Sequence, residues 1–132
     1  MKIRKLLIAI GISVVALFAI GKILPLVIDA AYPRMRASTK AFSMHGVADG
    51  AYEGKAFLLP VSVEVRVTVA GGRISSVELL RHFNGQGKPA EAVIGRVIEK
   101  QSLGVDVISG ATHSSLTIWK ALENALEKGK KR

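Results

Sequence analysis

The sequence predicts an α+β protein, in which an N-terminal transmembrane helix precedes a small antiparallel-sheet domain with two amphipathic helices. Three observations predict this class. An apolar run fills most of the first 28 residues, the segment 61–69 alternates strictly between valine and polar residues, and two later segments repeat apolar residues at helical spacing. The strands precede and mix with the helices without regular β–α–β alternation, which favours α+β over α/β.

Length and composition exclude several classes of protein. With 132 residues, the chain can form one small domain and an appendage. It has no cysteine, which excludes disulfide scaffolds, thiolate metal sites and cysteinyl cofactors. Its formal charge of +9 is typical of nucleic-acid binders. Yet the excess lies at the two ends, because residues 41–127 hold eight basic and nine acidic residues. We therefore expect no nucleic-acid partner.

The N-terminal segment is predicted to be a single-pass anchor in the cell membrane, covering residues 1–28. Its apolar run from Leu6 to Ile28, interrupted by Lys22, has 23 residues and would be about 34 Å long as a helix. That length can cross a hydrocarbon core of about 30 Å. A cleaved signal peptide is the alternative, because Ala19-Ile20-Gly21 fits a small-x-small cleavage site, but the apolar stretch beyond it favours an anchor. Basic residues flank the run on both sides and do not choose its orientation.

Residues 29–47 are predicted to form a juxtamembrane linker, because Pro33 should end any helix that leaves the membrane. The folded domain is expected over residues 48–128, and residues 129–132 form a basic tail.

Within the domain, residues 51–57 are expected to form a short strand. The alternating segment 61–69 forms the next strand, and Gly71-Gly72 supplies the turn of a hairpin whose second strand covers 73–80. A fourth short strand is expected at 105–108. One amphipathic helix is indicated by Ala90, Val93, Ile94, Val97 and Ile98, and a second, ending near Gly129, by Ser115, Ile118, Trp119, Leu122, Ala125 and Leu126.

The segment before the second helix is the most informative for chemistry. Ser109, Gly110 and Ala111 have little bulk, so another molecule can approach their backbone closely. Thr112 falls at or just before the first helical turn, where free N–H groups and the helix dipole favour a phosphate. The same residues also fit an ordinary serine/threonine helix cap.

These residues resemble the small bacterial FMN-binding domain that carries covalent flavin, which also occurs in subunits of the sodium-pumping NADH:quinone oxidoreductase and of the Rnf complex. The family pattern Asp-x-x-Ser/Thr-Gly-Ala-Thr is present in full, as Asp106, Ser109, Gly110, Ala111 and Thr112. The likeness covers roughly residues 48–128, and includes Asp49-Gly50-x-Tyr52-x-Gly54 and the turn Gly72-Arg73-Ile74.

The resemblance implies FMN as the cofactor, held through a phosphoester on Thr112. It also implies that Asp106 belongs to a signature read by a separate flavin transferase, which takes FMN from FAD and uses magnesium. A threonine hydroxyl is a poor nucleophile without a base, and only His113 is adjacent, so self-attachment is not expected.

A second loop resembles the family's His-x-Asn-Gly-x-Gly segment, although an ordinary loop remains the alternative. Weaker candidates for cofactor contact are His82, Asn84, Gly85, Gly87 and His113. A metal site at His82 and His113 is not expected, because no third ligand stands out.

The resemblance implies a membrane-anchored electron carrier, rather than a stand-alone enzyme, working between a membrane donor and an extracytoplasmic acceptor protein. Two alternatives remain open. One is a tethered module that binds FMN or another phosphate ligand non-covalently, and the other is a structural or interaction domain without flavin.

Overall fold

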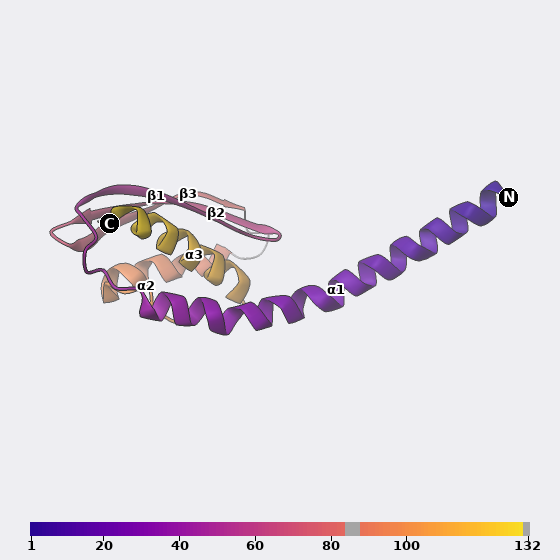
Figure 1. Ribbon diagram of the computed structural model, residues 1–132, viewed down its shortest axis with the longest axis horizontal. Helices are drawn as coiled ribbons and strands as arrows, with labels where there is room; N and C mark the ends of the chain where they lie inside the picture. Colours follow the sequence, from indigo (N-terminus) through magenta and orange to yellow (C-terminus); the bar gives the residue numbers. More distant parts are fainter. Residues whose placement is uncertain (84–87, 131–132) are drawn as a thin grey trace. The chain divides into compact units, whose positions relative to one another are not determined.

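A computed structural model describes residues 1–83 and 88–130 of the chain. The chain divides into two compact units, Met1–Pro33 and Arg34–Arg132. Helix α1 (Lys2–Ala41) contributes residues to both units, and all other helices and strands belong to the second (Figure 1).

The first unit is a helical segment whose apolar side chains are exposed. Leu7, Leu17 and Phe18 are each exposed by 63–70%. The helix is long and apolar enough to cross a membrane, although a signal sequence has the same properties. An apolar surface of this extent favours contact with lipid over contact with water.

The prediction that Pro33 ends the helix is wrong, because α1 contains both Pro25 and Pro33 and continues to Ala41. A proline inside a helix removes one backbone hydrogen bond and disfavours the helical conformation of the preceding residue. Beyond Pro33, tertiary contacts within the second unit compensate: Thr39 is only 1% exposed, and Arg36 pairs with Asp106. Packing of this kind decides helix formation more than local propensity does.

The sheet of the second unit has three antiparallel strands in the order β1 (Gly50–Leu58), β2 (Val61–Ala70) and β3 (Arg73–Phe83). The predicted alternation of β2 is confirmed, because one face of the strand is buried and consists of Val61, Val63, Val65, Val67 and Val69. Gly71 and Gly72 have φ angles of +60° and +71°, as the hairpin requires.

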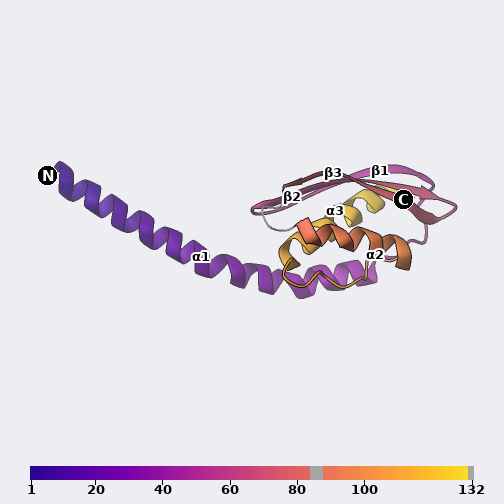
Figure 2. The same ribbon diagram turned by 180° about the vertical axis from the view of Figure 1, so that it is seen from behind.

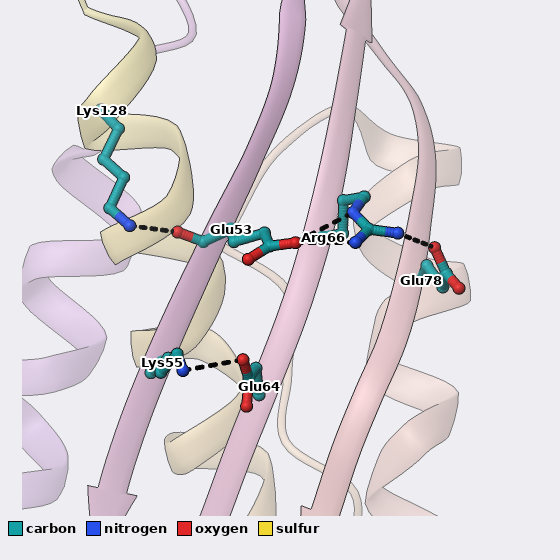
Figure 3. Close-up of polar contacts among 6 residues, drawn as sticks. All are labelled: Glu53, Lys55, Glu64, Arg66, Glu78 and Lys128. Carbon is teal, nitrogen blue, oxygen red and sulfur yellow. Dashed lines mark hydrogen bonds and ion pairs between the residues drawn. The ribbon is translucent and has the colours of Figure 1, made fainter.

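The other face of the sheet carries a network of ion pairs (Figure 3). Arg66 on β2 contacts Glu53 on β1 at 2.7 Å and Glu78 on β3 at 3.0 Å, while Lys55 and Glu64 pair at 2.8 Å. These pairs join all three strands on a surface that faces water. Glu53, and to a smaller extent Glu78, raise the pKa of the Arg66 guanidinium.

The helices of the second unit cover the valine face of the sheet. A short 3-10 helix η1 (Lys88–Glu91) leads into α2 (Ala92–Lys100), and α3 (Thr112–Gly129) follows. Figures 1 and 2 show α2 and α3 on the same side of the sheet, with α3 against β1 and β2 and α2 against β3. Trp119, Leu122 and Leu126 of α3 are completely buried. Both amphipathic helices and the α+β class are therefore confirmed.

The expected fourth strand at 105–108 is wrong, because the whole segment between α2 and α3 is irregular. Two of its apolar residues are nevertheless buried, with Leu103 1% and Val105 2% exposed, while Val107 and Ile108 are half-buried. The backbone N–H of Ile108 is satisfied by the Ser115 hydroxyl at 3.1 Å instead of by a neighbouring strand. A partly buried apolar segment thus need not form a strand, because a side chain can accept the backbone N–H that a neighbouring strand would otherwise bind.

Candidate functional site

The small-residue motif lies where the irregular segment meets the first residue of α3. Gly110 has a φ of +77°, which favours glycine, and a Cβ placed there would meet no atom within 4 Å. The conformation of the turn therefore favours glycine at this position, and the space beside it is open. Ser109 next to it is also exposed.

The interpretation of this motif as an ordinary helix cap is wrong. The N-cap position is taken by Ala111, whose side chain makes no cap hydrogen bond, and Thr112 is the first helical residue. The first backbone N–H that bonds within the helix is that of Ser115, which donates to the Ala111 carbonyl at 2.9 Å. The N–H groups of the first turn therefore lack helical acceptors, and the positive end of the helix dipole lies at Thr112.

The hydroxyl groups near this helix start differ in availability. Ser115 Oγ donates to the Ala111 carbonyl at 2.8 Å, and Thr117 Oγ1 donates to the His113 carbonyl at 2.9 Å. In contrast, the half-buried Thr112 makes no side-chain hydrogen bond within residues 1–83 and 88–130. Ser114 also makes no side-chain hydrogen bond within the described residues, but it is only 3% exposed, so the half-buried Thr112 has the more accessible hydroxyl of the two.

His113 joins the start of α3 to the end of β1. Its Nε2 lies 2.8 Å from the Leu58 carbonyl oxygen, and because a carbonyl only accepts, Nε2 must be the donor. Its Nδ1 is buried and has no hydrogen-bond partner among the residues that the structure describes. The ring therefore fixes the position of the motif and leaves one buried nitrogen for a further contact.

Asp106 is the charged residue of the motif, and it is exposed to solvent. Its Oδ1 lies 2.7 Å from Arg36 Nη2, and 72% of its side chain is exposed to solvent. The hydrogen bond and charge of Arg36 lower the pKa of the Asp106 carboxyl, with smaller contributions from Lys100 and Lys40. Sequence reasoning missed Arg36, because 70 residues separate it from Asp106 and no local pattern marks it.

His82 lies at the same end of the sheet as the motif. It pairs with Val63 on β2. Leu58, whose carbonyl accepts the hydrogen bond from His113, pairs with Val61, two residues away on the same strand. The His82 side chain is 2% exposed, and its Nδ1 lies 2.9 Å from Oε1 of Glu91, a residue that the sequence did not single out. The other predicted contacts of this loop, Asn84, Gly85 and Gly87, lie outside the described residues.

Two aromatic residues of the domain, Trp119 and Tyr52, take part in packing and in local hydrogen bonding. Trp119 is buried in the core, and the Tyr52 hydroxyl donates to the Ala48 carbonyl at 2.7 Å. Within residues 1–83 and 88–130, no group of three or more histidine, aspartate or glutamate side chains is arranged to hold a metal.

The fold and the site define a small α+β domain whose uncapped helix end and open turn suit a phosphate-bearing ligand. The model of the FMN-binding domain family matches residues 60–127, which is more than half of the chain. The protein therefore belongs to the FMN-binding domain family, and its cofactor is FMN. Two observed features fit the phosphate end of that cofactor: the free N–H groups at the start of α3 and the open space beside Gly110.

A curated relative extends the comparison beyond the family. An uncharacterized protein of Treponema pallidum (strain Nichols) is 34% identical over 95 residues, which are 70% of this chain and 26% of that protein. The chain thus spans about a quarter of the length of the curated relative it matches.

Proposed function

We propose that this protein is a membrane-anchored flavoprotein that carries FMN covalently on Thr112 and acts as an electron carrier. The observation that carries the proposal is the half-buried Thr112 hydroxyl, which has no hydrogen-bond partner in the described chain and stands at the start of an uncapped helix within a complete Asp-x-x-Ser-Gly-Ala-Thr motif. FMN supplies the redox chemistry when bound, and the chain supplies attachment, orientation and the electrostatic environment.

The attachment is a group transfer from FAD. Thr112 Oγ1 forms a bond to the phosphorus on the FMN side of the pyrophosphate, the bond from that phosphorus to the bridging oxygen breaks, and AMP leaves with that oxygen. The hydroxyl proton is released, and no oxidant or reductant is consumed. A threonine hydroxyl needs a base. The Nε2 of His113 donates to Leu58, and its other nitrogen, Nδ1, is buried, so we assign the activation to a separate magnesium-dependent flavin transferase.

The helix start then holds the phosphodiester that results. It carries one negative charge, which the free N–H groups of the first turn and the dipole of the 18-residue helix α3 stabilise. Ser109 and Gly110 are exposed and leave room for the phosphate and for the approaching transferase, whereas Ala111, expected to do the same, is buried. His82, Asn84, Gly85, Gly87 and His113 remain our candidates for contact with the isoalloxazine ring, because His82 and His113 lie at the same end of the sheet.

The transfer reaction gives a direct test. The full-length protein, incubated with transferase, FAD and magnesium, should gain the mass of one FMN unit, and Thr112→Ala should gain none. Thr117→Ala is the matched control, because it removes a hydroxyl of the same type from the same helix, one that is already hydrogen-bonded to the His113 carbonyl. Wild type without added mass, or a labelled Thr112→Ala variant, would overturn the assignment.

A second candidate is non-covalent binding of FMN at the same helix start, which the free N–H groups also favour. Fluorescence on a denaturing gel separates the two, because only a covalent flavin stays with the unfolded chain.

For the cellular role, we propose a single-pass anchor with the FMN domain outside the cytoplasmic membrane, relaying electrons from a membrane donor to an acceptor protein. The support is the bare apolar surface of the N-terminal helix, together with the family resemblance. Protease added to spheroplasts should digest the domain, and a fully protected domain would overturn this orientation.

A further inference from the structure

The last turns of α1 are built into the second unit, next to the attachment motif. Thr39 is 1% exposed and its hydroxyl donates to the Arg36 carbonyl at 3.1 Å. The Ser38 hydroxyl hydrogen-bonds the Glu123 carboxylate of α3. A Cβ on Gly104, two residues before Asp106, would lie 3.5 Å from the Lys40 Cα, so the two backbones pass close together. The segment Arg34–Ala41 is therefore firmly placed beside the irregular chain that leads to Thr112.

Within this contact, Arg36 is the group that reaches the motif. Its guanidinium lies 2.7 Å from Asp106 Oδ1; the Arg36 side chain is 28% exposed and the Asp106 side chain 72%. The strand expected around Asp106 is absent, so no sheet ladder orients this residue. The backbone carbonyl of Asp106 accepts a longer bond of 3.3 Å from Arg96. The orientation of the carboxylate is thus set from α1, a helix outside residues 60–127 that match the family.

We propose that Arg36 is a positioning residue for FMN transfer, which holds the Asp106 carboxylate in the orientation that the transferase reads. This inference rests on the proposed function, and it makes the segment Arg34–Ala41 a working part of the attachment site. The exposed side of the carboxylate stays available to the transferase, while the side bound to Arg36 fixes its direction. A solvent-exposed ion pair contributes little to folding stability, so the contact is better explained by geometry than by stability.

The test measures FMN transfer to the full-length protein in detergent, with the concentration of the apo-protein varied. Arg36→Ala should lower kcat/KM by about tenfold, mainly through a higher KM for the apo-protein, because a mispositioned recognition group weakens productive binding. Arg36→Lys keeps the charge and should lose less. Arg34→Ala is the matched control, because it removes an exposed cation from the same segment and should behave as wild type.

A double-mutant cycle shows whether Arg36 acts through Asp106. In an Asp106→Asn background, Arg36→Ala should cause little further loss. An equal loss in that background would overturn the inference, as would a transfer rate for Arg36→Ala that matches Arg34→Ala or exceeds wild type. Thermal unfolding of each variant confirms that the second unit is folded. If wild type itself is not labelled, the proposed function fails, whereas a labelled wild type with an unaffected Arg36→Ala variant refutes only the role of Arg36.

Discussion

Two glycines beside helix α3 differ in what their neighbourhood allows. A Cβ on Gly54 of β1 would lie 2.0 Å from the Ala121 carbonyl oxygen and 2.8 Å from the Ala125 Cβ. A Cβ on Gly110, just before the helix, would meet nothing within 4 Å. The middle of α3 is therefore packed against the sheet with no room for an added carbon, while the turn that precedes its first residue is open at Gly110. The helix packs in the core along its length, and the turn before it leaves space for a ligand.

The largest effect should come from filling the packed region. Gly54→Ala should destabilise the domain by roughly 3 kcal/mol, because the backbone of α3 must move away from β1. Gly95→Ala is the matched control. An added Cβ there meets no atom within 4 Å in helix α2, and the change should stabilise the domain by roughly 0.5–1 kcal/mol. Denaturant unfolding of both variants measures the contrast, and equal stabilities would contradict it.

A smaller effect should follow at the open end. Gly110→Ala should cost about 1–2 kcal/mol, because the φ of +77° strains any side chain even where space is free. Gly110→Asn should cost less, since asparagine tolerates this conformation. Unfolding curves give the stability, and a loss for Gly110→Ala as large as that for Gly54→Ala would show that the open end is in fact packed.

His113 links the two regions through its hydrogen bond to Leu58. His113→Ala should cost about 1 kcal/mol from the lost bond and should slow FMN transfer, because the motif loses its tie to β1. His113→Gln can place an amide N–H near the Leu58 carbonyl and should recover part of the rate. If alanine and glutamine give the same transfer rate, this hydrogen bond does not position the motif.

The smallest effect concerns Asp49, which precedes β1 and whose side chain reaches the β2–β3 turn. Its carboxylate accepts the N–H groups of Gly71 and Gly72 at 2.8 and 2.9 Å. The Gly72 bond, followed by the Gly71 bond, lowers the Asp49 pKa below its ordinary value of 3.8. Because the folded-state pKa is the lower one, the stabilisation is present above the unfolded-state pKa and is lost as the pH falls through the folded-state pKa.

Thermal unfolding at several pH values checks this expectation. Wild type should lose stability below pH 4 more steeply than Asp49→Asn, whose side chain does not titrate. Parallel curves for the two proteins would show that Asp49 does not contribute to the acid dependence.

Much of the fold was predictable because its signals are local. The valine alternation of β2, the paired glycines of the hairpin and the apolar spacing of α2 and α3 each follow from a period of two or 3.6 residues. The errors at Pro33 and at 105–108 have one common cause. In both places tertiary contacts outweighed a local pattern. After Pro33 the helix continues and buries Thr39, and at 105–108 the Ser115 hydroxyl takes the place of a strand partner.

By itself, the sequence determined the α+β class, the apolar N-terminal helix and the motif from Asp106 to Thr112, because each depends on residues that are neighbours in the chain. The tertiary structure decided which hydroxyls at the start of α3 are buried or hydrogen-bonded and left that start uncapped. It also brought Arg36 to Asp106 and Leu58 to His113, over separations of 70 and 55 residues. Contacts at such distances depend on how the helices and strands pack, and no local period encodes them.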